Sequence, residues 1–512
     1  MLGYPNPAAR AAPLRMRPRT LVAADPRRPH RVPDGTEAVV VGGGIAGISA
    51  AVVLAERGVA VTVLEAAPTL GGRLGAWPHT LPDGTEQVVE HGFHAFFRHY
   101  YTWRALLRRI DPELSFLRPI GGYPVLSRTW PPEDLTGLPA APPLNLLALF
   151  ARSPSLVLAD LLGADTERAS ALLAYDRDTT TARFDDVPAA DFLAGLGMSD
   201  RAQAMLFEAF ARSFFARPQA LSAGELIAMF HYYFLGNPEG IAFDAPDTDY
   251  LTCIWNPFAA YLDKHGATVR TATPARALVP ADGHRWRIET DAGPLTTRHV
   301  VLATEPGALR DLFAASPAAA DAAPRLAAKA ARVAVAPPFA VTRLWLDRDV
   351  APQRPTFSAV SREPTLDSVT VYSRLERPSA QWAARTGGSV VELHSYACDA
   401  PDVATATARM RDELAALWPE TVDARVVHVQ QRMEATAPTF PPGGAGSRPL
   451  PAGEARGIRV AGDHVETPFL SGLMERAAAS AVLAANDVLA EAGAGPEPIR
   501  GVPQRGLLAG LR

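Results

Sequence analysis

Residues 37–65 constrain the fold most, because they read as a strand, a tight turn, a helix and a second strand in close succession. Residues 37–41 (EAVVV) and 59–64 (VAVTVL) are short apolar runs rich in β-branched side chains, as expected of buried strands. Between them, residues 48–57 are small and apolar and end at Gly58, a common helix stop. A strand–helix–strand unit of about 30 residues predicts a right-handed parallel crossover, and therefore an α/β fold.

The turn of this unit carries the spacing G-x-G-x-x-G at Gly42, Gly44 and Gly47, with Ala46 inside it. The first glycine allows the tight turn, the second lets the backbone approach a pyrophosphate, and the third lets helix and strand pack closely. Glu65 ends the second strand, where its carboxylate can accept both ribose hydroxyls of an adenosine. The alternative is a glycine-rich turn without a ligand. Strand, helix and acid together favour a dinucleotide site.

A second glycine pair, Gly71-Gly72, follows with Arg73 directly after it. A backbone turn and a guanidinium at this point can contact the same pyrophosphate, which simple nicotinamide enzymes do not need. Here the chain resembles the amine-oxidase and carotenoid-desaturase family of flavoproteins, whose motif runs on from the acid into R-x-G-G-R. The resemblance implies FAD as the cofactor. Thr69 stands where the first arginine of that motif is expected.

Far downstream, residues 458–461 read as a buried strand that runs into Gly462-Asp463, and residues 471–490 read as a long helix containing Met474. This stretch is similar to the family's C-terminal flavin motif. The resemblance implies that Gly462, Asp463 and Met474 bind FAD, with Asp463 at the ribityl–phosphate region. It also implies that the positive start of the helix faces the flavin pyrimidine edge. Arg476 and Ala481 replace two glycines of that motif.

Since 512 residues exceed the roughly 250–300 of one hydrophobic core, we expect two interleaved domains. The fold class expected is α/β: a Rossmann-like FAD-binding domain of the glutathione-reductase type, interleaved with an α+β substrate-binding domain that carries a mixed sheet and helices. The FAD-binding domain is assigned residues 37–110, 262–312 and 455–490, and Val269 in its second segment is a further cofactor contact. The substrate-binding, membrane-facing domain is assigned residues 111–261 and 313–454. Residues 1–36 are expected to be a disordered arginine- and proline-rich leader, and residues 491–512 a flexible tail.

Charge and cysteine content narrow the class of protein. A net charge of −4 does not suggest a nucleic-acid binder. Two distant cysteines form no disulfide framework and no metal spacing, which favours a cytoplasmic protein without a metal site. The longest apolar stretch, residues 144–162, is interrupted by a charge and a proline, so it does not span a bilayer but can lie on one. We expect peripheral, monotopic association with membrane.

Residues 90–97 (EHGFHAFF) look like the corresponding stretch of plant- and cyanobacterial-type phytoene and ζ-carotene desaturases. Within that group, residues 93–101 and 106–112 most resemble the isorenieratene synthases, which desaturate β-carotene and shift a methyl group. The resemblance implies hydride transfer from a carotenoid to flavin, with quinone or oxygen as the final electron acceptor. His94 or Glu90 could accept the proton that is lost; the alternative is that both only fix the loop under the flavin.

Three other functions remain open from the sequence: a linear phytoene or ζ-carotene desaturase, a flavin amine oxidase, and a non-catalytic prenyl-lipid-binding protein of the same fold. Amine oxidases of the family place a lysine near the flavin. The chain has two lysines, Lys264 and Lys329, and neither lies on the expected substrate-domain strand. The intact glycines together with Glu65 and Asp463 argue against a non-catalytic lipid binder.

Overall fold

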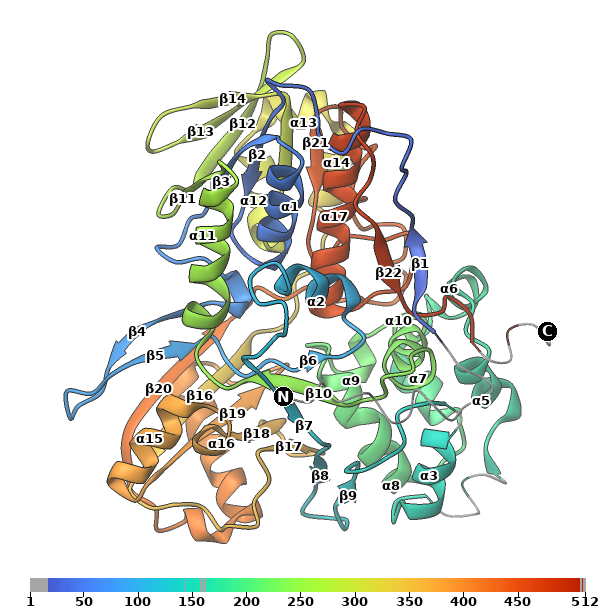
Figure 1. The fold of residues 1–512 in the computed structure, drawn as a ribbon. Coiled ribbons are helices and arrows are strands. Elements are labelled where there is room, and N and C mark those ends of the chain that lie inside the picture. The colour runs from blue at the N-terminus through green and yellow to red at the C-terminus, as the bar shows by residue number, and fades with distance from the viewer. Residues whose placement is uncertain (1–16, 143, 157–159, 161–162, 507–508, 510–512) are drawn as a thin grey trace.

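The computed structural model describes residues 17–142, 144–156, 160, 163–506 and 509. Three parts are visible in Figure 1: a parallel sheet with its helices at the top, a large mixed sheet at the lower left, and a group of helices at the lower right. The chain passes between these parts several times, so each is assembled from segments that are distant in sequence.

The parallel sheet has five strands in the order β11-β3-β2-β15-β21. Their bounds are β2 (Glu37–Val41), β3 (Ala60–Leu64), β11 (Thr268–Arg270), β15 (His299–Leu302) and β21 (Ile458–Val460). The β-branched runs stay buried because helices cover both faces, as is usual for parallel sheets. The expected strands at 37–41, 59–64 and 458–461 are therefore present, and the sheet takes its five strands from three separate segments of the chain.

Alternate side chains of β2 enter two different cores. Val40 packs with α1 (Ile45–Glu56) and α17 (Leu473–Glu491), whereas Val39 and Val41 pack with helices on the opposite face. The helices of the opposite face are α12 (Pro306–Ala314), α13 (Pro317–Ala322) and α14 (Pro324–Ala330). Residues 46–55 of α1 are all buried, because α17, α2 (Tyr101–Leu107) and α11 (Asn256–Lys264) surround it. This explains why the helix is apolar on every side. A small antiparallel sheet of β12 (Ala275–Ala281), β13 (Arg285–Thr290) and β14 (Leu295–Thr297) completes this part.

The large sheet has seven strands in the order β20-β16-β19-β18-β17-β8-β9 and is mixed, because β8 pairs with β17 in parallel. The strands are β8 (Pro124–Leu126), β9 (Glu133–Asp134), β16 (Phe339–Leu346), β17 (Phe357–Val360), β18 (Ser368–Val371), β19 (Ser389–Ser395) and β20 (Val426–Glu434). Helices α15 (Arg377–Thr386) and α16 (Val403–Leu417) pack on it. Strand β16 begins at Phe339, directly after two prolines at residues 337 and 338, which cannot donate to a strand ladder.

The helical part lies beside this sheet (Figure 1). Its α-helices are α3 (Leu144–Arg152), α5 (Thr166–Leu173), α6 (Arg177–Phe184), α7 (Ala189–Ala194), α8 (Asp200–Ala202), α9 (Ala209–Arg212) and α10 (Ala223–Phe230). Two wider π-helical turns, η3 (Gln203–Glu208) and η5 (His231–Leu235), extend α8 and α10. Short strands join the parts: β4 (Ala76–Thr80) with β5 (Glu86–Glu90), and β10 (Phe243–Pro246) between β6 (Phe96–Phe97) and β7 (Leu117–Ile120).

The expectation of a disordered leader (residues 1–36) and a flexible tail (residues 491–512) is wrong for those of their residues that the structure describes. Strand β1 (Arg19–Val22) pairs antiparallel with β22 (Ile499–Gly501), and the two lie side by side in Figure 1. Arg57 donates to the Gly495 carbonyl at 2.7 Å and pairs with Glu497 at 2.9 Å, which fixes the tail against α1. Composition gives no signal for a pairing between such distant residues. Residues 1–16 lie outside the described part of the chain.

Within the stretch 144–162, the described helix α3 ends at Arg152. In the described part of the chain, no helix combines the length and the apolar character required to cross a membrane.

Candidate functional site

One large cavity connects the parallel sheet to the helical part of the molecule. Its volume is about 1170 Å³, which exceeds the roughly 300–1,000 Å³ typical of a pocket for one small ligand. Most of the predicted cofactor residues line it, as does one of the two predicted catalytic residues: Gly42, Gly44, Ala46, Glu65, Gly71, Gly72, Arg73, Gly462, Asp463, Met474 and His94. Gly47, Val269 and Glu90 are not part of the lining.

The three glycines of the first turn have different surroundings. A Cβ on Gly42 would lie 2.4 Å from the Ala303 carbonyl oxygen, and a Cβ on Gly47 would lie 1.8 Å from the Gly42 carbonyl oxygen. Both positions therefore need glycine for packing. A Cβ on Gly44 would meet no atom closer than 3.7 Å, and its backbone has an ordinary negative φ. The space at Gly44 is therefore open to the cavity, as required for the close approach of a pyrophosphate.

Glu65 is held in place by two backbone amides at the carboxyl end of β3. Gly43 donates to one carboxylate oxygen at 2.6 Å and Ala67 donates to the other at 2.7 Å. Each carboxylate oxygen can accept a further hydrogen bond. The side chain is thus positioned to accept ribose hydroxyls at the cavity edge. Val269 lies on the neighbouring strand β11, paired with Val63, and supports the sheet rather than the cavity.

Arg73 and Asp463 join the two predicted halves of the site. Their side chains form an ion pair with Nη2 and Oδ1 2.6 Å apart. Burial opposes ionisation of Asp463, but Arg73 holds the pKa of that carboxyl below its ordinary value. Burial likewise opposes the charge on Arg73, and Asp463 with Glu305 raises its pKa. A charged pair therefore stands at the centre of the cavity wall.

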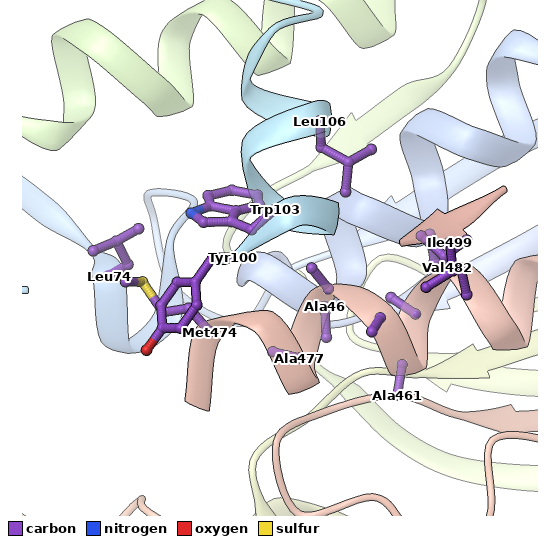
Figure 2. Packing of buried hydrophobic residues seen from close by; sticks show 14 of the residues in the cluster. Ala46, Leu74, Tyr100, Trp103, Leu106, Ala461, Met474, Ala477, Val482 and Ile499 are labelled. Atoms are coloured by element: carbon purple, nitrogen blue, oxygen red, sulfur yellow. The ribbon is translucent and has the colours of Figure 1, made fainter. Parts of the chain in front are cut away.

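Helix α17 begins at this wall. Gly472 precedes its first residue without a side-chain cap, and Leu473, Met474 and Ala477 line the cavity. Leu473 has a φ of 47°, a strained conformation for a residue with a side chain. The start of α17 leaves backbone amides that favour a negative charge in front of them. Figure 2 shows Leu74, Tyr100 and Trp103 grouped near Met474, from segments far apart in the sequence.

His94 faces the cavity and is neutral. Burial lowers its pKa to about 3, although the bond to the Gly92 carbonyl opposes this shift. His94 Nδ1 lies 2.9 Å from that carbonyl oxygen, which can only accept, so Nδ1 carries the hydrogen. The Nε2 atom of the neutral ring is then left with a free lone pair. Tyr250 fixes the same loop through the Gly92 carbonyl and the His94 amide, at 3.1 and 3.2 Å.

Glu90 lies in a buried charge cluster instead. Arg343 Nη2 is 2.7 Å from Glu90 and 2.8 Å from Glu392, and the side chains of all three are at most 1% exposed. Glu392 also accepts from the Phe93 amide at 2.7 Å, so this cluster supports the loop that carries His94. Burial and the neighbouring Glu90 raise the pKa of Glu376 in the same cluster well above its ordinary value. The position of Glu90 favours the loop-fixing interpretation over proton transfer.

The far arm of the cavity is mainly apolar and aromatic. Its walls come from α3, the two π-helical turns, α9 with the residues after it, the end of α10 and the large sheet. They include Leu146, Leu149, Met205, Phe207, Phe210, Phe214, Phe230, Tyr233, Phe234, Phe339 and Phe357. Wide helical turns of this kind are frequent at functional sites. Lys329 pairs with Glu454 at 2.7 Å and Lys264 is exposed on α11; neither lines the cavity. In the described part of the chain, no three histidine, cysteine, aspartate or glutamate side chains gather as metal ligands.

Several polar cavity residues were not predicted. Glu305 caps the start of α12 through the amides of Gly307 and Ala308, both at 2.7 Å. An acid before Pro306, directly after a buried strand, is a helix-start signal that could have identified it. Asp367 gives no such signal. It pairs with Arg212 at 2.7 Å, and burial raises its pKa to about 6 despite that arginine.

These features define a class of protein, because a nucleotide-binding turn, a central ion pair and a helix start converge on one cavity. A family profile described as flavin containing amine oxidoreductase matches residues 45–489. The chain belongs to this family and is a flavin-dependent oxidoreductase. Solved structures of the same fold include a cyclohexylamine oxidase from Brevibacterium oxydans, with a TM-score of 0.62 and 17% identity over 89% of this chain and 99% of that one. A putative protoporphyrinogen oxidase from Exiguobacterium has a TM-score of 0.60 and 19% identity over 90% and 99%.

The chain is 44% identical to a carotenoid phi-ring synthase from Streptomyces griseus, over 97% of this chain and 96% of that one. It is 27% identical to a carotenoid phi-ring synthase from Chlorobaculum tepidum, over 92% and 91%. A probable ζ-carotene desaturase from Synechococcus elongatus matches 24% of the chain at 27% identity.

Proposed function

We propose that this protein is an FAD-dependent carotenoid oxidoreductase that aromatises the β-ring of β-carotene, with migration of a ring methyl group from C1 to C2. The 44% identity to a phi-ring synthase over nearly the whole of both chains supports this product class. Forming one aromatic ring removes two hydrides and two protons from the substrate. Each hydride needs a two-electron acceptor, and the enzyme returns to its oxidised state by passing electrons to a quinone or to oxygen.

The observation that carries the proposal is the continuity of the cavity. The same cavity is lined by the glycine turn at one end and by aromatic side chains at the other. The residues at the first end fit FAD: Gly44 leaves room for a pyrophosphate, Glu65 is oriented for a ribose, and α17 begins where the flavin belongs. When bound there, FAD supplies the acceptor for a hydride. The aromatic end suits a polyene, which has no group for a salt bridge.

His94 is the residue that we assign to proton transfer. Its Nε2 lone pair lies on a cavity-lining side chain, and the Gly92 carbonyl holds the ring in the required tautomer. A low pKa makes imidazole a weak base in water, but a ring carbocation is a very strong acid and needs only an acceptor within reach. Tyr250, Glu392 and Arg343 act through the loop and are positioning residues.

Helix α3 supports a membrane-facing entrance. Leu144, Leu147 and Phe150 are 52%, 61% and 39% exposed, whereas Leu146, Leu149 and again Phe150 line the cavity. One helix therefore forms part of the cavity wall and also presents apolar side chains outward. Such a surface fits the interfacial region of a bilayer, from which a carotenoid can enter without crossing water.

A flavin amine oxidase is the second candidate, since solved structures of the fold include amine oxidases. The positions of both lysines disfavour it, because an amine oxidase of this family is expected to have a lysine at the flavin, and Lys329 is paired with Glu454 instead.

The deciding experiment is expression in two pigmented bacterial hosts, one accumulating β-carotene and the other phytoene, followed by chromatography and absorbance of the pigments. An aromatic-ringed product from β-carotene supports the proposal. A longer linear polyene from phytoene alone would replace it with ordinary desaturation. Yellow, folded protein without any pigment change, together with turnover of an amine, would replace it with amine oxidation.

A further inference from the structure

A second pocket, of about 100 Å³, lies outside the main cavity. It lies beside residues 464–471, which lead into α17 and are called the flavin-side loop below. Its lining comes from five segments and includes these charged or polar side chains: Arg177, Asp185, Glu225, Arg332, Arg448, His464 and Arg476. We propose that this pocket binds a small oxyanion, of the size of phosphate or a short carboxylate, between Arg448 and His464.

His464 supplies an unused hydrogen-bonding group. Its side chain is almost wholly buried, and neither ring nitrogen has a hydrogen-bond partner within the described chain. Asp463 lines the main cavity while the adjacent His464 lines the second pocket, so the two side chains point to different sites. Burial lowers the pKa of His464 to about 4, so the ring is neutral and offers one N–H donor. A buried imidazole without a partner is costly unless a ligand or water satisfies it.

Arg448 supplies a cation without a counter-ion. No carboxylate in the described ranges lies within ion-pair distance of its guanidinium, which sits 5.1 Å from the centre of the Phe440 ring. Arg476 lies 4.8 Å from the same ring centre and pairs with Glu225 at 2.6 Å. Burial lowers the pKa of Arg448, and the more distant charges of Glu225 and Glu466 oppose this shift without reversing it.

The local charge count favours an anion. Arg177 and Arg476 are matched by Glu466, at 3.0 Å, and by Glu225. The other two charged lining residues, Asp185 and Arg332, have opposite signs, so the charge of Arg448 is left over. An oxyanion there would accept from a planar guanidinium and from the imidazole N–H, a combination suited to phosphate or carboxylate oxygens. The volume holds such an ion with a few waters but excludes a nucleotide.

Occupancy of this pocket should stiffen the flavin-side loop. Arg476 donates through Nε to the Ser471 carbonyl at 2.9 Å, and residues 464–471 connect His464 to the start of α17. An ion held between Arg448 and His464 therefore restrains the segment that presents α17 to the flavin. This inference does not depend on which substrate occupies the main cavity.

The test is isothermal titration of the FAD-loaded protein with inorganic phosphate and, separately, with acetate, at constant ionic strength set by sodium chloride. We expect saturable binding of one ion per chain, at least tenfold weaker in Arg448→Gln and unchanged in Arg287→Gln, an exposed arginine paired with Glu289. Binding of phosphate only, or of acetate only, identifies the ion; binding of both supports a general oxyanion site.

Two results would overturn the proposal: no saturable binding of either ion, or equal affinity in Arg448→Gln. Should Arg448→Gln fail to fold, His464→Phe gives the second variant, with the same expected loss. A crystal of the unchanged protein soaked in phosphate provides an independent readout, since density between Arg448 and His464 is expected, and density elsewhere alone contradicts the site.

Discussion

The guanidinium of Arg73 and the carboxylate of Asp463 lie 2.6 Å apart, although 390 residues separate them in the chain. Arg73 follows the second glycine pair, and Asp463 follows the strand that completes the parallel sheet. Both side chains line the cavity. The two halves of the proposed flavin site are thus linked by a direct charge interaction as well as by the shared sheet.

Breaking this pair should weaken flavin retention. In Arg73→Gln or Asp463→Asn, one buried charge loses its partner, at a cost of about 1.5–3 kcal/mol. We expect FAD affinity to fall by about tenfold or more, measured as the flavin-to-protein absorbance ratio after gel filtration and as a dissociation constant. Arg287→Gln is the control and should retain full flavin. Normal flavin content in both cavity variants would show that the pair is not part of the cofactor site.

Two glycine substitutions should give opposite outcomes. Gly47→Ala places a Cβ 1.8 Å from the Gly42 carbonyl oxygen, so the helix must move and the protein should lose stability. Gly44→Ala has 3.7 Å of clearance and should fold normally, yet it should bind FAD poorly because the methyl group occupies the pyrophosphate space. Thermal unfolding of the apoprotein, together with FAD titration, separates the two effects. Equal stability loss in both variants would contradict the assignment of Gly44 to ligand space.

Glu475 predicts a pH dependence of stability. Burial raises its pKa to about 7, despite hydrogen bonds from the Trp103 and Thr102 amides at 3.0 and 2.8 Å. A raised carboxyl pKa means that the folded state holds the proton more tightly than the unfolded state does. The free energy of unfolding of the unchanged protein, compared with that of Glu475→Gln, should therefore fall as the pH rises from about 4.5 to about 7. The fall should be on the order of 3 kcal/mol, and the difference should stay constant above about pH 7. Urea unfolding at several pH values measures this, and a difference that is flat with pH would refute it.

Substitutions on α3 should reduce membrane binding without loss of fold. Leu144→Glu with Leu147→Glu places two charges on the exposed apolar face, where each opposes insertion into the interfacial region. Flotation with liposomes should move the unchanged protein upward and leave this variant at the bottom. Val422→Glu is the matched control, because Val422 is 65% exposed, similar to Leu147 at 61%, but lies outside the cavity lining. If both variants float like the unchanged protein, α3 is not the docking surface.

His94→Ala tests proton transfer. Loss of the acceptor should lower the turnover of β-carotene by about 100-fold or more, with normal flavin content. His284→Ala, at an exposed turn, should leave turnover unchanged. Full turnover in His94→Ala would show that this residue only fixes its loop and does not accept a proton.

The glycine turns, Glu65 and the first two strands could be predicted because each depends on local sequence chemistry. Residues 37–64 fold as expected, apart from a helix that begins at Ile45 instead of Ile48. The ion pair of Arg73 with Asp463 could not be predicted from spacing, since it depends on β21 joining β15. Asp367 and the Arg343 cluster were missed for the same reason. The residues around them come from strands and helices that are distant in sequence, and no local pattern shows that these elements pack together. The pairing of β1 with β22 was missed because the composition of a segment indicates how polar it is but not which strand it pairs with.

The order of strands in the parallel sheet has a consequence for biosynthesis. β21 contributes an edge strand and α17 covers one side of α1, yet both are synthesised after the other strands of this sheet. Until residue 491 has emerged from the ribosome, the nascent sheet has an unpaired edge at β15, and the side of α1 that packs against α17 remains uncovered. We therefore expect flavin binding to require that both β21 and α17 have been synthesised. A translation product that stops before β21 should expose apolar surface and aggregate.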